Sequence, residues 1–190
     1  KYIVLSERIK GLPNIRILNL KNGTSYYMKF KESAYNCSIS DRNLHFDTDL
    51  IRYSYTSLTT PFSTYEYNMK TKKQKLLKKG EVVGGYDQKK YFTERIFAKS
   101  RNGKKIPISL VYRKDKYKKS GKLLLYAYGS YGSTVNPYFS IPRLSLLDRG
   151  FCFAIAHIRG GKIYDESWYE DGKLLKKKNT FYDFIDCAKF

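Results

Sequence analysis

The chain has no long apolar run, few cysteines and few histidines. None of its apolar stretches approaches the roughly 18 consecutive residues that a membrane-spanning helix needs. No segment combines the charged, apolar and small-residue parts of a signal sequence. Three cysteines among 190 residues are too few, and odd in number, for a disulfide framework. We therefore expect a cytoplasmic protein with reduced, buried thiols and no membrane partner.

Histidine is also scarce, with two residues in the chain, which leaves little scope for a metal centre. His45, Asp47 and Asp49 alternate at a spacing of two, but without a fourth ligand this pattern is a weak signal for metal. A polar strand face explains the three residues more simply. We expect neither a metal nor an organic cofactor.

Acidic residues are outnumbered: 17 Asp and Glu stand against 37 Lys and Arg, which gives a formal net charge of +20. Such an excess can attract nucleic acid or an acidic partner. The lysines, however, gather in runs at residues 70–79, 113–122 and 173–178, which are typical of turns and solvated faces. We do not predict nucleic-acid binding, and a non-catalytic basic binding module stands as the alternative function.

The first part of the sequence has the pattern of short strands joined by turns. Apolar segments at residues 15–20 and 26–30 flank an Asn-Gly dipeptide, which favours a hairpin turn. Residues 51–55 and 64–69 form a second pair. Strands at this spacing, without helices, are typical of a sandwich, a barrel or propeller blades, and periodicity does not choose among them.

Strands and helices alternate after a segment rich in glycine and charge. Residues 123–128 have the pattern of a continuous, buried strand, a helix is predicted around residues 141–147, and another strand at residues 151–158. This alternation predicts a parallel or mixed sheet covered on both faces. We expect one domain in residues 1–85 and a second in residues 86–190.

Both ends of the chain lie inside apolar patterns. The sequence starts at Lys1, directly before an apolar run. A helix predicted to open with a capping box of Thr180 and Asp183 continues to Phe190. Since domain boundaries normally fall in polar linkers, we expect this chain to be an internal piece of a longer protein.

Several short motifs, which we call sequence words, occur in order along the chain. The second half contains LYAYGSYG (125–132), PYF (137–139), RLSLLDRGF (143–151), AHIRGG (156–161), WYEDGK (168–173) and KNTF (178–181). The first half contains GLP (11–13), FDT (46–48) and SLTTP (57–61). Together these words resemble the prolyl oligopeptidase family of serine peptidases and, within it, oligopeptidase B. The resemblance implies the C-terminal blades of a seven-bladed β-propeller, followed by the N-terminal part of an α/β-hydrolase domain.

The resemblance also implies an activity. Members of this family are serine endopeptidases that cleave short peptides through an acyl-enzyme, and this branch cleaves after arginine or lysine. Their machinery is a serine in a Gly-x-Ser-x-Gly turn, then an aspartate, then a histidine. No serine of this chain has glycine both two residues before and two residues after it. The three residues would therefore lie beyond Phe190, and the chain alone is predicted to be inactive; a pseudoenzyme scaffold is the further alternative.

Two residues imitate members of this machinery. Ser130 lies in a GSYG word, but Tyr128 occupies the position two before it, where the strained turn requires glycine. His157 precedes the missing serine, whereas the family's histidine comes last. We expect Ser130 to be a loop serine and His157 a structural residue at a strand end.

Tyr128 and Tyr131 are the predicted site residues. The resemblance implies that the Tyr128 hydroxyl donates a hydrogen bond to the oxyanion of the tetrahedral intermediate; the alternative is a core aromatic at a strand end. Tyr131 matches an aromatic position in the pocket for the side chain before the scissile bond, where its ring could stack on a guanidinium; plain loop packing is the alternative. Lys162 and Ile163 replace the family's usual glycine and glutamate, and Ala127 a usual glycine, so we expect that loop to differ in shape or charge.

Overall fold

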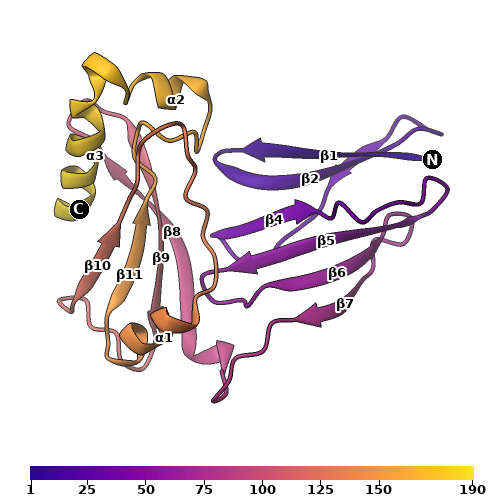
Figure 1. The fold of residues 1–190 in the computed structure, drawn as a ribbon, viewed down its shortest axis with the longest axis horizontal. Coiled ribbons are helices and arrows are strands. Elements are labelled where there is room, and N and C mark those ends of the chain that lie inside the picture. The colour runs from indigo at the N-terminus through magenta and orange to yellow at the C-terminus, as the bar shows by residue number, and fades with distance from the viewer.

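The computed structural model describes residues 1–190, arranged in three β-sheets and a few short helices. Figure 1 shows the two N-terminal sheets on one side of the molecule and the third sheet, with the helices, on the other. All strands of the first two sheets precede residue 80, and all strands of the third follow residue 90.

The two N-terminal sheets are antiparallel, and strands that are consecutive in sequence are neighbours in each sheet. The first sheet consists of β1 (Tyr2–Ile9), β2 (Leu12–Asn19) and β3 (Ser25–Tyr27). The second consists of β4 (Tyr35–Ile39), β5 (Leu50–Ser57), β6 (Ser63–Asn68) and β7 (Gln74–Lys79). Antiparallel neighbours need only short turns between them, which explains why turn-forming residues are frequent in this part of the sequence.

One hydrophobic core joins these two sheets. Ile15 and Ile17 of β2 are fully buried, because alternate residues of a strand point to the same face. They share this core with Tyr53 and Tyr55 of β5. The phenol hydroxyls do not lie unpaired in the core, since Tyr53 donates to Gln74 Oε1 and Tyr55 to a Glu32 carboxylate oxygen.

The third sheet is mixed and has the strand order β10-β11-β9-β8. Its strands are β8 (Tyr91–Lys99), β9 (Lys105–Arg113), β10 (Leu123–Tyr126) and β11 (Cys152–Ala156). The helices are η1 (Gln88–Lys90), α1 (Ile141–Asp148), α2 (Glu166–Glu170), η2 (Leu174–Lys176) and α3 (Lys178–Lys189). Only β10 and β11 run parallel.

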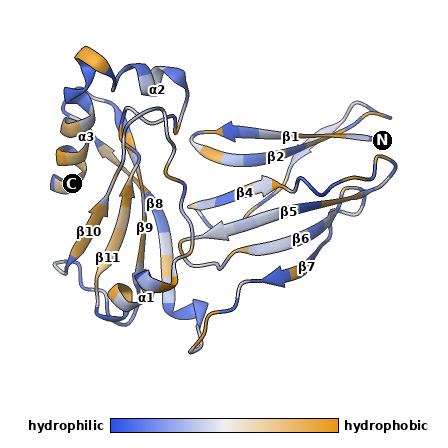
Figure 2. Cartoon of the chain, viewed as in Figure 1, coloured by the Kyte–Doolittle hydropathy of each residue, from blue (hydrophilic) through white to orange (hydrophobic).

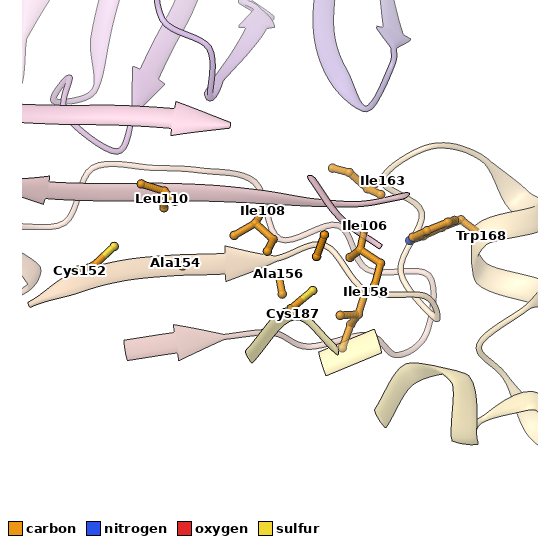
Figure 3. Close-up of a cluster of buried hydrophobic side chains, with 11 residues drawn as sticks. Ile106, Ile108, Leu110, Cys152, Ala154, Ala156, Ile158, Ile163, Trp168 and Cys187 are labelled. Carbon is orange, nitrogen blue, oxygen red and sulfur yellow. The ribbon is translucent and has the colours of Figure 1, made fainter. Parts of the chain in front are cut away.

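Both faces of the third sheet carry a core, as the sequence predicted. Ala154 and Ala156 of β11 share one core with Trp168 of α2 and Cys187 of α3 (Figure 3). Ile155, between the two alanines, points to the opposite face and packs in a second core with Leu147 of α1. The central strands are therefore fixed from both sides, which gives a rigid base for the loops that follow them.

The SLTTP segment joins the two parts of the molecule. Leu58 is buried in the same core as Tyr91, the first residue of the third sheet. The Tyr86 hydroxyl donates to the Thr59 carbonyl at 2.6 Å, and the backbone N–H of Phe139 donates to Thr56 Oγ1 at 3.2 Å. The N-terminal sheets are thus bonded directly to the part of the chain that carries the helices.

The strand predicted at residues 123–128 differs in length and burial from the expectation. β10 ends at Tyr126, and Leu123, Leu124 and Tyr126 are 50%, 43% and 46% exposed. Its only neighbour in the sheet is β11, so the other edge of β10 is open. Figure 2 shows β10 in the colours of hydrophobic residues in spite of this exposure.

The predicted capping box is wrong. Lys177 occupies the N-cap of α3, so Thr180 and Asp183 lie inside the helix. Their side chains bind other segments instead: Thr180 Oγ1 lies 2.9 and 3.0 Å from the carbonyl oxygens of Arg159 and Gly172, which share its one hydroxyl proton. Asp183 forms an ion pair with Arg159.

Several elements were absent from the prediction, among them β4, β7 and α2. β7 lies in the lysine-rich run at residues 70–79, where a turn and a solvated face were expected. All its residues are exposed, and most of the strand has the blue of hydrophilic residues in Figure 2. It is a strand because its backbone pairs with β6 and not because it buries a face.

The prediction for the cysteines is confirmed. Cys37, Cys152 and Cys187 are free and buried. Burial raises the pKa of the three thiols to about 12, 11 and 12, so each is neutral near pH 7. As for membranes, none of the helices combines the length and apolar character that a transmembrane span requires.

Candidate functional site

The residues predicted to form the site follow β10, at the carboxyl end of the parallel strand pair. β10 and β11 pair from Leu123 with Cys152 to Tyr126 with Ile155. Their carboxyl ends therefore meet at one end of the sheet, and the arrowheads in Figure 1 point there, toward α2. In open sheets that contain parallel strands, ligands bind outside the carboxyl ends of those strands.

The loops after these two strands are bonded to each other. We call residues 128–132 the tyrosine turn and residues 157–161 the glycine loop. The backbone N–H of Gly132 donates to the Gly160 carbonyl at 3.0 Å. The backbones lie so close that a Cβ atom built on Gly160 would be 2.1 Å from the Gly129 carbonyl oxygen. No residue other than glycine fits at position 160 without moving the tyrosine turn.

The tyrosine turn has an unusual backbone conformation. Gly129, Tyr131 and Gly132 have φ values of 61°, 54° and 64°. This left-handed region is accessible to glycine but disfavoured for a residue with a Cβ atom, such as tyrosine. Contacts between the turn and neighbouring segments must therefore hold the backbone of Tyr131 in this conformation.

Tyr128 lies at the start of the turn and is 47% exposed. Its inner side borders a cavity of about 10 Å³, with His157 and Ile163 among the other walls. A space of this size is about that of a single water molecule. The Tyr128 side chain is therefore partly accessible to a ligand at the carboxyl end of the sheet, and its role in an oxyanion hole stays a prediction.

Tyr131 extends into solvent and is 86% exposed. It borders a pocket of about 330 Å³, whose walls also include Tyr169, Lys173 and Lys177. Lys173 is paired with Glu170 at 2.5 Å, which offsets part of the positive charge. The pocket is large enough to receive one side chain of a ligand, and the assignment of Tyr131 to substrate binding stays a prediction.

Lys177, at the junction of η2 and α3, binds the tyrosine turn. Its Nζ atom donates to the Gly129 carbonyl at 2.6 Å and to Ser130 Oγ at 2.7 Å. Removal from solvent lowers the pKa of this amine below its ordinary value. Sequence reasoning missed this residue because it lies in a run of lysines in which nothing distinguishes one from the next.

A buried ion pair holds the glycine loop from the side of α3. Asp183 accepts three hydrogen bonds from Arg159: from the backbone N–H at 3.0 Å, from Nε at 2.8 Å and from Nη2 at 2.6 Å. The two side chains are only 2% and 0% exposed. Arg159 Nη2 also donates to Asn102 Oδ1 at 3.3 Å. The pair joins the glycine loop, α3 and the β8–β9 turn.

His157 has a structural environment, in keeping with the prediction. It is buried directly after β11, with Nε2 2.8 Å from Ser109 Oγ. Its carbonyl accepts a hydrogen bond from Trp168 Nε1 at 3.1 Å. Burial, and then the positive charges of Arg95 and Arg8, lower the pKa of His157 to about 3, so the imidazole is neutral near pH 7.

The other two sequence candidates have no arrangement that supports catalysis or metal binding. Ser130 Oγ bonds Lys177, with no histidine beside it. His45, Asp47 and Asp49 lie in the loop before β5 and not on a strand face, and Asp47 pairs with Lys1 at 3.0 Å. No group of three or more His, Cys, Asp or Glu side chains has an arrangement suited to a metal ion.

Comparison with known proteins identifies related domains in both parts of the chain. Residues 1–80 match the model of the prolyl oligopeptidase N-terminal β-propeller domain, and residues 137–190 match the model of the prolyl oligopeptidase family. Among curated proteins, the chain is 50% identical to dipeptidyl aminopeptidase BI of Pseudoxanthomonas mexicana, over 100% of its own length and 26% of that protein. It is 35% identical to protease 2 of Moraxella lacunata, over 98% of its length and 27% of that protein.

Solved structures give the same result. Oligopeptidase B from Trypanosoma brucei, in a closed form with covalently bound antipain, matches with a TM-score of 0.87 and 37% identity, over 100% of this chain and 28% of that one. Oligopeptidase B from Leishmania major matches with a TM-score of 0.87 and 36% identity, over the same shares. The chain thus spans about a quarter of the length of its relatives. The two domain matches and the order of the sequence words agree, and the chain belongs to the prolyl oligopeptidase family.

Proposed function

We propose that this chain is part of a serine peptidase that cleaves short peptides through an acyl-enzyme. The observation that carries this proposal is the placement of Tyr128, which lies partly exposed beyond the carboxyl end of β10 in a turn fixed by the glycine loop and by Lys177. A hydroxyl on such a support is preorganised to donate a hydrogen bond to an oxyanion. Stabilisation of the oxyanion is usually the largest single contribution to lowering the barrier of acyl transfer.

In this proposal the work is divided between this chain and the rest of a longer gene product. The Tyr128 hydroxyl donates to the oxyanion that forms when a serine attacks the peptide carbonyl. Tyr131 offers its exposed ring to the side chain before the scissile bond. The attacking serine, the aspartate and the histidine come from outside these residues, because no serine here has the glycine pattern of the nucleophile turn.

The finer parts of the proposal concern architecture and location. We place residues 1–85 in the C-terminal blades of a seven-bladed propeller and residues 86–190 in the N-terminal part of an α/β-hydrolase domain, in a cytoplasmic enzyme. The antiparallel sheets before residue 80 and the mixed sheet after residue 90 support this division.

We also propose cleavage after arginine or lysine, on the basis of the oligopeptidase B resemblance. The pocket beside Tyr131 contains Lys173 and Lys177, whose charges oppose a cationic side chain. Selectivity for arginine would therefore depend on stacking against Tyr131 and on carboxylates supplied from outside this chain. Equal kcat/KM values for fluorogenic peptides with arginine and with alanine before the scissile bond would rule out this preference.

The test of the function uses the full-length gene product. We expect a fluorophosphonate probe to label it, and Tyr128→Phe to lower kcat by about 10²–10³-fold with little change in KM, because the lost donor acts on the transition state. Tyr126→Phe is the matched control, since this tyrosine lies two residues earlier and is equally exposed, at 46% against 47%. An unlabelled protein that hydrolyses no peptide would instead be a pseudoenzyme scaffold or a basic binding module.

A further inference from the structure

We infer that Lys177 is a positioning residue of this site, which holds the tyrosine turn so that Tyr128 and Tyr131 keep their places relative to a bound peptide. The inference rests on the proposed function and deepens it. It assigns a task to one particular lysine of the basic run at residues 173–178.

The contacts of Lys177 set it apart from its neighbours in the run. Lys173 and Lys176 form ion pairs with Glu170 and Asp171, at 2.5 and 2.9 Å, as lysines on a solvated face do. Neither ion pair includes Lys177. Its amine donates instead to a backbone carbonyl and a hydroxyl of the tyrosine turn, at 2.6 and 2.7 Å. Lys177 thus contributes two directed hydrogen bonds to the turn.

The turn depends on such support from two sides. On one side, the glycine loop accepts the Gly132 N–H at its Gly160 carbonyl. On the other side, Lys177 Nζ is the only donor to the Gly129 carbonyl. Tyr131 lies between these anchors in the left-handed conformation that a tyrosine disfavours. Loss of the Lys177 anchor therefore allows the segment that links Tyr128 to Tyr131 to relax.

The chemistry of lysine suits this task. A protonated amine has three N–H donors, and two of them are used on the tyrosine turn. The titratable groups that share its pocket are Tyr131, Tyr169 and Lys173, and no carboxylate binds the amine. Because burial lowers the pKa of Lys177, this amine loses its charge at a lower pH than an exposed lysine does. The support of the turn weakens at alkaline pH in consequence.

The experiment compares Lys177→Met, Lys177→Arg and Lys176→Met in the full-length gene product. We expect Lys177→Met to lower kcat/KM by about 10–100-fold, the effect of a misplacement of roughly 1 Å at a site. Lys177→Arg should restore part of the activity and move the alkaline limb of the pH profile upward. Lys176→Met, the neighbouring lysine on the surface, should stay within about twofold of the wild type.

Hydrogen exchange provides a readout that does not depend on activity. The backbone N–H of Gly132 donates to the Gly160 carbonyl and that of Ser133 to the Ser130 carbonyl, each at 3.0 Å. In Lys177→Met these two amides should exchange faster, while the exchange rates of the β9 amides stay unchanged. Unchanged exchange at these two amides would overturn the inference, whether or not the protein is a peptidase. The inference would also be overturned if Lys177→Met kept the wild-type kcat/KM while Tyr128→Phe lowered kcat/KM. In that case the proposed function would stand.

Discussion

The buried ion pair between Arg159 and Asp183 gives the sharpest stability prediction. We consider Asp183→Asn, which keeps the size of the side chain but removes its charge. The substitution leaves the Arg159 guanidinium buried at 2% exposure with no carboxylate partner. It also turns an amide N–H₂ toward one of the three donors that the carboxylate accepts.

The magnitude follows from this geometry. Removing one partner of a buried ion pair costs about 3–5 kcal/mol, because the remaining charge has lost its compensation. Since every 1.4 kcal/mol corresponds to a factor of ten in an equilibrium constant, the local opening of α3 should become roughly a hundred-fold to several thousand-fold more populated. The Arg159→Met, Asp183→Leu double variant should lose much less than the sum of the two single variants, because no buried charge remains.

The assay is hydrogen exchange of the amides of α3, followed by mass spectrometry on the full-length protein. Asp186→Asn is the matched control, because Asp186 lies on the same helix and pairs with Arg101 through a similar set of three donors. That pair is at the surface, with side chains 44% and 12% exposed, and a surface pair contributes little. The reasoning is refuted if Asp183→Asn accelerates exchange in α3 no more than Asp186→Asn does.

Two further predictions concern His157 and Gly160. Because the folded pKa of His157 is depressed to about 3 from 6.5, the unfolded chain binds a proton first, so its contribution to stability is present above about pH 6.5 and is lost as the pH falls toward 3. His157→Gln should flatten the pH dependence of unfolding in that window, and an unchanged slope would contradict the assignment. Gly160→Ala should abolish folding of the site, since its Cβ would meet the Gly129 carbonyl oxygen at 2.1 Å. Gly84→Ala, with φ also positive but open space around it, should cost only about 1 kcal/mol; equal effects on the midpoint of thermal unfolding would refute the packing argument.

Much of the third sheet could be predicted from the sequence because its central strands, β9 and β11, are buried on two faces. The apolar run of β11 is continuous, although the strand covers Cys152–Ala156 and is shorter at both ends than the predicted 151–158. The helix predicted at residues 141–147 differs from α1 only at its last residue. β7 could not be found in this way, since all its residues are exposed and its pairing with β6 leaves no hydrophobic pattern. Burial leaves an apolar pattern in the sequence, and backbone pairing alone does not.

Residues of the candidate site could be proposed from the sequence only where a sequence word marked them, and their roles stay predictions. Tyr128 and Tyr131 belong to such a word, whereas Lys177 was hidden in a run of similar residues. The prediction of a capping-box role for Asp183 is wrong, because a Thr and an Asp three residues apart fit a capping box as well as they fit side chains that bind a neighbouring loop. The partner that decides between them, Arg159, is 24 residues away along the chain, beyond the reach of local patterns.

The open edge of β10 has a consequence for the order of events during synthesis. Its exposed leucines and its unpaired backbone form a template to which any passing strand can add. Translation proceeds at about 5–20 residues per second, so the roughly 60 residues that follow β10, none of which pairs with this edge, take about 3–12 s to emerge. During that interval β10 is available to the wrong neighbour, including β10 of another nascent chain. Crowding of ribosomes on one transcript would therefore bear most heavily on this part of the protein.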